Sequence, residues 1–168
     1  MKCLVLSDSH GTWEYMRQAV EREKPDQILH LGDVVRDVPN LAAAFPQIPI
    51  AQVLGNCDLS RGYDLPEERE LFWEGKRIWM LHGHTRWVKS GTAILLEEAH
   101  VRGADVVCFG HTHSPLCQQD GRLWVLNPGA CGGSVRVTYG VIEVVGGHLR
   151  CRVEELSNSR EPFSPLCV

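Results

Sequence analysis

Five short apolar runs of strand length each end at a residue that can bind a metal ion, and this pattern constrains the fold more than any other feature. The first run, residues 3–6, is followed by Asp8-Ser9-His10, and the last, residues 106–109, by Gly110-His111-Thr112-His113. The other three end at Gly32-Asp33, Gly55-Asn56 and His82-Gly83-His84. Ligands in open α/β sheets bind just beyond the carboxyl ends of the strands. We therefore expect the five ends to meet in one pocket that is built for two metal ions.

The composition is that of a soluble globular protein. With 168 residues the chain is most simply one domain, long enough to bury a sizeable core. The formal net charge of -4 argues against a general nucleic-acid binder, which normally carries a basic surplus. It does not exclude an anionic substrate, because bound divalent metals can reverse the local field. The sequence contains no apolar run of about 18 residues that would cross a membrane.

Cysteine usage indicates the compartment. The seven cysteines are scattered and form no Cys-x-x-Cys pair, so neither a zinc ribbon nor a thioredoxin-type site is predicted. Reduced thiols suit the cytosol, and the chain begins in a predicted strand without the pattern of a signal peptide. We expect a cytoplasmic protein.

Strand and helix patterns alternate over the first third of the chain. The predicted strands are residues 2–7, 27–31 and 48–54, and the predicted helices are 13–23 and 38–45. Strands that alternate with helices imply a parallel sheet with right-handed crossovers.

The second part is richer in strands and turns. The predicted strands lie at 70–73, 77–80, 105–109, 115–118, 122–126, 137–145 and 148–155, with one helix at 91–102. Asp120-Gly121 and Gly146-Gly147 are hairpin signals. This order fits an α/β protein with two sheets packed face to face and helices outside. Residues 157–168 have no periodicity and are predicted to be a C-terminal tail.

The types of side chain at the strand ends suit a dinuclear centre. Asp8 and His10 can point the same way only in an extended or turning backbone, which the end of a strand provides. Asn56 offers a neutral amide oxygen. Two ions about 3.5–4 Å apart can clamp the attacking and leaving oxygens of a phosphoryl displacement. Each motif alone is weak, whereas five in this order are specific.

With this ordered set, the chain resembles the calcineurin-like metallophosphoesterase superfamily, most closely its small single-domain branch of bacterial and archaeal phosphodiesterases. The resemblance covers residues 1–155 and implies a four-layer αββα sandwich of two mixed sheets, with a domain at 1–156. It implies that two divalent ions, most simply manganese but also iron, nickel, cobalt or zinc, lie at the strand ends. The implied ligands are Asp8, His10 and His113 for the first metal, Asp33 as the bridge, and Asn56, His82 and His111 for the second.

One position departs from the wider superfamily. Many members read Gly-Asn-His-Asp or Gly-Asn-His-Glu, and that histidine is thought to protonate the leaving group or bind the phosphate. This chain reads Gly55-Asn56-Cys57-Asp58, as the small phosphodiesterase branch does. A thiol is an inferior positioned acid, because its unperturbed pKa is about 8.5 and its hydrogen bonds are weak. The implied catalytic group is Asp33, Asn56, Cys57, Asp58 and His84.

Other candidates have two interpretations. His84 could contact phosphate or act as an acid, or it could only fix its loop, and Asp58 is expected to orient its neighbours. Arg61 and Arg86 lie in loops near the site and could meet phosphate oxygens, although exposed arginines are common. Two further histidines, His30 and His100, are expected to be structural. Trp13 and Trp87 each follow a ligand motif and could line the substrate groove.

The sequence therefore predicts a metal-dependent phosphodiesterase in which a metal-bridging hydroxide attacks a small phosphodiester. A metal-binding scaffold of the same fold and a phosphomonoesterase or phosphatase are the alternatives. No membrane or general nucleic-acid partner is expected, and the family resemblance allows a homodimer or larger homo-oligomer. The natural substrate, native metal and oligomeric state stay open.

Overall fold

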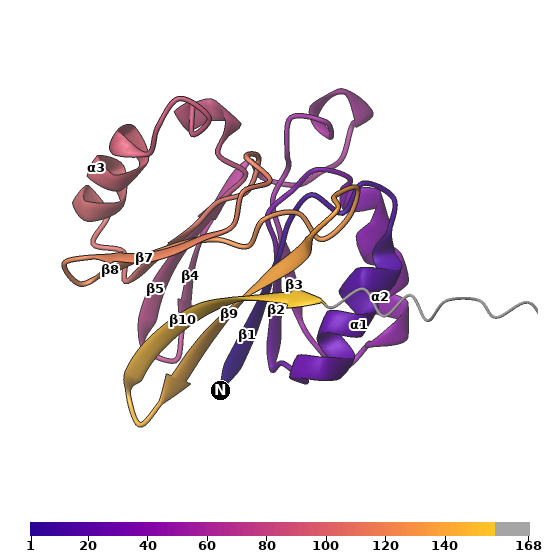
Figure 1. Ribbon diagram of the computed structural model, residues 1–168, viewed down its shortest axis with the longest axis horizontal. Helices are drawn as coiled ribbons and strands as arrows, with labels where there is room; N and C mark the ends of the chain where they lie inside the picture. Colours follow the sequence, from indigo (N-terminus) through magenta and orange to yellow (C-terminus); the bar gives the residue numbers. More distant parts are fainter. Residues whose placement is uncertain (157–168) are drawn as a thin grey trace, which may run out of the picture.

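Two five-stranded mixed sheets face each other and carry helices on their outer sides (Figure 1). The computed structural model describes residues 1–156 apart from the side chain of Arg61, so the predicted tail at 157–168 lies outside the described residues. The strand orders are β10-β9-β1-β2-β3 and β4-β5-β6-β8-β7.

The first sheet is built from both ends of the described chain. Its parallel strands are β1 (Lys2–Leu6), β2 (Gln27–His30) and β3 (Ile50–Gln52), and its antiparallel pair is β9 (Val137–Val145) and β10 (His148–Leu156). The crossovers contain α1 (Trp13–Glu23), η1 (Val35–Asp37) and α2 (Val38–Ala44). The predicted strand at 48–54 is shortened at its start because Pro49 has no N–H to donate to the sheet.

The middle of the chain forms the second sheet. Its strands are β4 (Glu68–Trp73), β5 (Lys76–Leu81), β6 (Val106–Cys108), β7 (Leu116–Asp120) and β8 (Leu123–Asn127). Strands β5, β6 and β8 run parallel, and β4 and β7 flank them in the antiparallel sense. The connections contain η2 (Leu59–Arg61), η3 (His84–Arg86) and α3 (Ala93–Val101).

Three layers of buried apolar side chains separate the four layers of structure. Val5 and Met80 belong to the layer between the two sheets. Met16 of α1 packs in the layer outside the first sheet, and Leu95 of α3 in the layer outside the second. The predicted αββα sandwich is confirmed, because each sheet is buried on both faces.

Hydrogen bonds between loops bring the carboxyl ends of the parallel strands to one edge of the sandwich. The Asp8 amide donates to the Gly32 carbonyl over 3.1 Å, and the Gly110 amide donates to the His82 carbonyl over 3.0 Å. The two sheets are joined there too, since the His111 amide donates to an Asp8 carboxylate oxygen over 3.2 Å. All the strand ends that carry predicted ligands therefore converge.

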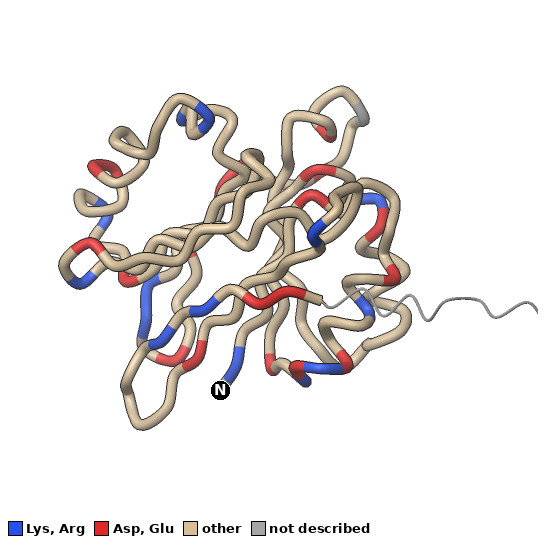
Figure 2. The backbone as a smooth tube through the Cα atoms, viewed as in Figure 1, with Lys and Arg blue, Asp and Glu red and all other residues tan. Residues whose placement is uncertain are grey.

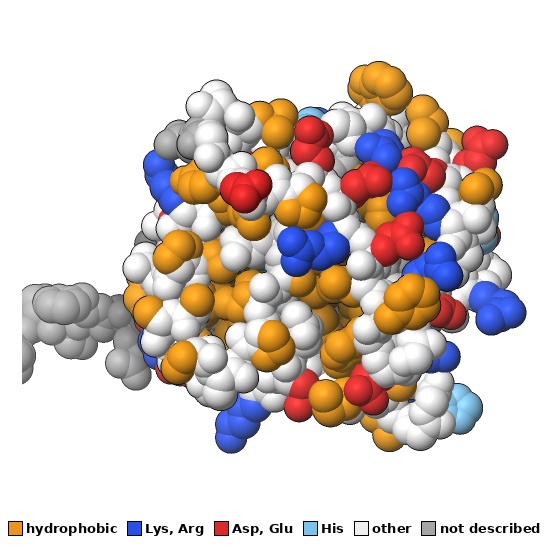
Figure 3. Space-filling view, turned by 180° about the vertical axis from the view of Figure 1, so that it is seen from behind, with side chains coloured by type: hydrophobic (Ala, Val, Ile, Leu, Met, Phe, Trp, Pro, Cys, Tyr) orange, Lys and Arg blue, Asp and Glu red, His pale blue; other side chains and the backbone are white. Residues whose placement is uncertain are grey.

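Charges of both signs are distributed over the surface. Lys and Arg are interspersed with Asp and Glu over the backbone (Figure 2). On the face seen in Figure 3, hydrophobic side chains are interspersed with charged ones of both signs. No helix in residues 1–156 is long and apolar enough to cross a membrane.

Candidate metal centre

The predicted ligands sit in an uncommon backbone conformation. Five of them, namely Asp8, His10, Asp33, His111 and His113, have positive φ angles between 46° and 66°. Only a few per cent of non-glycine residues adopt this left-handed region, and those that do cluster at functional sites. The sharp turn after each strand directs the side chain towards the edge of the sandwich.

A first cluster joins Asp8, His10 and His113. The His113 Nε2 atom lies 3.0 Å from Asp8 Oδ1 and 3.2 Å from His10 Nε2, and His10 Nε2 lies 4.0 Å from the same Asp8 oxygen. One ligand atom from each residue lies within 4.8 Å of the other two. These three side chains are the ligands predicted for the first metal, to which the prediction adds Asp33 as the bridge between the two metals.

A second cluster joins Asp8, Asp33 and His82. The His82 Nε2 atom lies 3.4 Å from Asp33 Oδ2 and 4.0 Å from Asp8 Oδ1. The His111 ring centre is 5.1 Å from that of His82. Asn56 follows at the next loop, where its neighbour Cys57 donates a backbone hydrogen bond to Asp33 Oδ1 over 2.9 Å. Of the residues predicted for the second metal, His82 and His111 lie beside each other, and Asn56 adjoins the group through Cys57.

Two buried atoms in these clusters are unsatisfied. Asp8 Oδ1 and His82 Nε2 are shielded from solvent and have no hydrogen-bond partner. Buried polar atoms nearly always have a hydrogen-bond partner, so two neighbouring atoms without one require an explanation. A divalent cation would satisfy both, and carboxylate, imidazole and amide donors suit first-row transition metals. The residues present therefore fit the metal ions that the motifs imply.

Neighbouring groups orient the ligand atoms. The Ser7 hydroxyl donates to Asp8 Oδ2 over 2.6 Å, which leaves Oδ1 to face the cluster. The His82 Nδ1 atom lies 2.8 Å from the Leu31 carbonyl oxygen. That contact requires the proton on Nδ1 and leaves the Nε2 lone pair available for a metal.

Two side chains that hold the loops together carry no metal-binding motif, and the sequence analysis missed them. Asp37 accepts hydrogen bonds from the Ser9 hydroxyl and the Gly11 amide, over 2.7 and 2.8 Å. Asn127, at the end of β8, donates to the Gly110 carbonyl over 3.1 Å and to the Thr112 hydroxyl over 3.0 Å. The turn signal Asn-Pro-Gly at residues 127–129 could have pointed to Asn127 as a residue that holds a loop.

Asp58 has the surroundings of an orienting residue. It is buried, and its carboxylate accepts hydrogen bonds from the backbone amides of Val34, Val35 and Gly55, all between 3.0 and 3.1 Å. It ties the loop of the Gly55-Asn56 motif to the loop that follows Asp33.

Electrostatics favour ionised acids in the cluster. Burial alone would raise the pKa of Asp33, but the His82 side chain and the Cys57 amide lower it well below its usual range. Burial alone would lower the pKa of His82, but Asp33 and Asp8 raise it. The Asp8 carboxylate, 3.0 Å away, raises the pKa of His113. Burial lowers the pKa of His111 to about 4, so that imidazole is neutral.

Cys57 and His84 lie at the rim of the clusters. Burial, followed by interaction with Asp33, raises the pKa of the Cys57 thiol to about 11, so it is protonated at neutral pH. The His84 ring centre is 5.6 Å from that of His82, and both His84 nitrogens are buried without a hydrogen-bond partner. Burial, followed by the positive charge of His82, lowers the pKa of His84.

Arg86, one of the two arginines that could meet phosphate, is engaged in ion pairs. Arg86 forms ion pairs with Glu68 and Glu98 over 2.6 and 2.9 Å, so it fixes η3 instead of facing the clusters. The side chain of Arg61 lies outside the described part.

Of the remaining candidate residues, two are packed in the interior and two are exposed on the surface. His30 is buried in β2, and His100 is exposed and ion-paired with Asp120 over 2.9 Å. Trp13, the first residue of α1, packs against the core, whereas Trp87 is 67% exposed just beyond η3.

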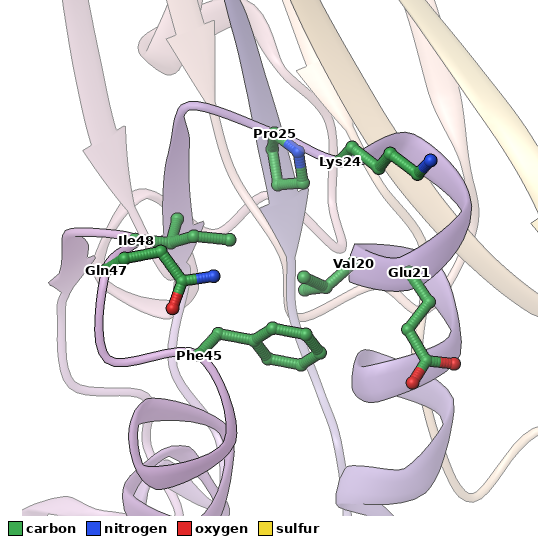
Figure 4. A pocket seen from close by; sticks show the side chains of 7 residues that line it. All are labelled: Val20, Glu21, Lys24, Pro25, Phe45, Gln47 and Ile48. Carbon is green, nitrogen blue, oxygen red and sulfur yellow. The ribbon is translucent and has the colours of Figure 1, made fainter.

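An apolar cavity of about 390 Å³ lies away from this chemistry, between the end of α1 and the turn before β3 (Figure 4). Phe45 and Ile48 face Val20 across it. It contains none of the predicted ligands.

Comparisons with known proteins agree with this geometry. The family model described as "Calcineurin-like phosphoesterase superfamily domain" matches residues 1–147. The chain is similar to a probable metallophosphoesterase, YsnB, of Bacillus subtilis, with 32% identity over 133 residues that cover 77% of this chain and 75% of the relative. It is also similar to the phosphodiesterase YfcE of Escherichia coli K12, with 25% identity over 85% of this chain and 88% of that protein.

Solved structures share the fold. A predicted phosphoesterase from Streptococcus pneumoniae TIGR4 has a TM-score of 0.74 and 25% identity, and the match covers 92% of this chain and 88% of that one. Vps29 from Entamoeba histolytica, solved with Zn²⁺, has a TM-score of 0.75 at 18% identity, covering 92% of this chain and 99% of that one. The second likeness concerns the fold alone.

Metal binding should release protons and weaken as the pH falls. The pKa values of His82 and His113 are raised above 6.5 without metal, and a metal requires both imidazoles unprotonated. Protons therefore compete from near neutral pH downwards. We expect Mn²⁺ affinity, measured by titration calorimetry, to fall at least about tenfold between about pH 8 and about pH 6. Buffers of different ionisation enthalpy should reveal the released protons.

A matched control is the exposed histidine at position 100. His100→Gln should keep the same pH dependence, because His100 is exposed, pairs with Asp120 and belongs to neither cluster. Equal affinity at both pH values without proton release would contradict the proposed involvement of His82 and His113.

Proposed function

We propose that this chain, which belongs to the calcineurin-like phosphoesterase superfamily, is a phosphodiesterase that depends on two divalent metal ions. The observation that carries the proposal is the pair of clusters that share Asp8, with two buried, unsatisfied atoms between them. The phosphodiesterase name of a similar protein, YfcE, supports the choice of diesters.

The proposed ligands divide between two metals. Asp8, His10 and His113 would hold the first ion, Asn56, His82 and His111 would hold the second, and Asp33 would serve both. Manganese is our first choice, with iron, nickel, cobalt and zinc as alternatives. When bound, the pair of ions supplies positive charge for both the attacking and the leaving oxygen of an in-line displacement.

The protein side chains would orient the substrate and limit the choice of leaving group. Asp33 and Asp8 are kept ionised by the imidazoles beside them, so they can hold cations over a wide pH range. Cys57 stands where many superfamily members have histidine, and its raised pKa makes it a poor proton donor. His84 is the other candidate donor. Diesters whose leaving groups need little protonation are therefore favoured.

The scaffold alternative draws on the similar fold of Vps29. It is disfavoured because all seven predicted ligands are present here in sequence. Cytoplasmic location, a small phosphodiester substrate and a possible homo-oligomer remain part of the proposal.

The test is Asp33→Asn, assayed on bis-p-nitrophenyl phosphate with added Mn²⁺. Since one carboxylate serves both ions, kcat/KM should fall at least about a hundredfold while the thermal unfolding temperature shows a folded protein. The control is Asp64→Asn, which removes an exposed carboxylate from the connection between β3 and β4. Full activity of Asp33→Asn, or of the parent after exhaustive chelation, would exclude a two-metal mechanism. Faster turnover of phosphoserine or a sugar phosphate than of the aryl diester would make the protein a phosphomonoesterase.

A second test concerns position 57. Cys57→His would restore an imidazole beside Asp33 and Asp58, and Cys57→Ala would remove the thiol altogether. General acid catalysis contributes about 10²–10⁴-fold, mostly where the leaving group is poor. We expect the histidine variant to exceed the alanine variant strongly on an alkyl diester and only slightly on the p-nitrophenyl diester. Equal rates for both variants on every leaving group, with equal metal content, would mean that position 57 does not face the leaving oxygen.

A further inference from the structure

A cavity of about 290 Å³ adjoins the candidate metal centre on the side of His113. Apart from His113, its lining includes none of the residues assigned to the metals or to catalysis. It is formed by Ser114 and Pro115, which follow His113, by residues 134–136, which lead into β9, and by Thr138 of β9. A volume of this order suits a small organic group.

Two glycines fix the second wall of this cavity to the metal-binding loop. A Cβ atom at Gly132 would lie 1.8 Å from the Ser9 carbonyl oxygen, and one at Gly133 would lie 3.0 Å from the His10 Cβ atom. Gly133 also has a φ angle of +62°. Glycine allows this close approach, so the segment that leads to residues 134–136 packs directly against the loop that carries His10. The cavity wall therefore adjoins the loop of predicted ligands.

The polar groups in the wall suit an anion. Arg136 provides a guanidinium group, and Ser114 and Ser134 provide hydroxyl groups. The Arg136 side chain is 72% exposed, and its ion pair with Glu155 spans 2.7 Å. Such exposed pairs contribute little to stability, so a substrate anion can replace Glu155 at low cost. Guanidinium groups are well matched to phosphate and carboxylate oxygens.

Thr138 closes the inner wall of the cavity. It is only 3% exposed, and its backbone amide donates to the Ala130 carbonyl over 3.1 Å. Its hydroxyl oxygen packs against Gly129, where an added Cβ atom would lie 2.1 Å away. Arg136, Ser114 and Ser134 therefore supply the polar groups of the cavity.

We infer that this cavity binds one of the two organic groups of the phosphodiester, and that Arg136 selects a group carrying a second negative charge, such as an additional phosphate. The inference rests on the proposed function. With the scissile phosphate at His113, one substituent of the diester would extend past Ser114 towards Arg136. The protein would therefore prefer a phosphorylated nucleoside or sugar diester to an uncharged one.

The experiment compares two chromogenic esters that share a leaving group. They are thymidine 5′-(p-nitrophenyl phosphate) with and without a 3′-phosphate. We expect the parent to prefer the 3′-phosphorylated ester, mainly through a lower KM. In Arg136→Ala this preference should fall about tenfold, the size expected for one charge-assisted hydrogen bond. Glu155→Gln, which frees Arg136 from its ion pair, should increase the preference.

Two further variants control for structural effects. Arg150→Ala removes an exposed arginine from β10, outside this cavity, and should leave the preference as in the parent. Thr138→Val keeps the size of the side chain and should leave KM for both esters as in the parent, because the Thr138 hydroxyl packs against Gly129. An Arg136→Ala variant with the parent's preference would overturn the inference.

Failure of the inference and failure of the proposed function give different results. If the parent hydrolyses neither ester, the proposed function fails and the inference with it. If it hydrolyses both with equal efficiency, only the subsite fails. Calorimetric binding of thymidine 3′,5′-bisphosphate provides a readout independent of turnover, and it should weaken about tenfold in Arg136→Ala. Unchanged binding in that variant would also overturn the inference.

Discussion

A buried carboxylate, that of Asp8, is the feature on which the rest of this structure depends. It is fully buried at the end of β1, where an ionised group is unfavourable unless it is compensated. Ser7 and the His111 amide satisfy one oxygen, and His113 and His82 approach the other. Because that second oxygen has no hydrogen-bond partner, it can still bind a cation.

The loops around Asp8 support one another rather than acting separately. Asp37 holds the loop that contains His10, Asp58 joins the loops of Asp33 and Asn56, and Asn127 holds the loop of His111 and His113. Each of these links uses a side chain to bind backbone groups, so the left-handed turns are fixed before any ion arrives. Preorganisation of this kind is what a precise metal centre requires.

The sequence could predict the parts of the site that are local. An apolar run followed by an acid or a histidine locates both a strand and its end, and this placed Asp8, Asp33, His82, His111 and His113 close together, as the structure has them. The partners of Arg86 could not be predicted, because Glu68 and Glu98 come from β4 and α3 and meet it only in the folded sandwich. For the same reason the cavity at Arg136 was not foreseen, since its two walls are about twenty residues apart in the chain. Asn56 lies in its expected loop, and its amide nitrogen lies 3.5 Å from the neighbouring Cys57 sulfur.

The most direct test of the account is to locate the metal ions in a crystal of the Mn²⁺-loaded protein by anomalous scattering. The account predicts two peaks about 3.5–4 Å apart, with the Asp33 carboxylate between them. Asp8, His10 and His113 should surround one peak, and Asn56, His82 and His111 the other. A single peak, or two peaks that do not share Asp33, would contradict the central claim.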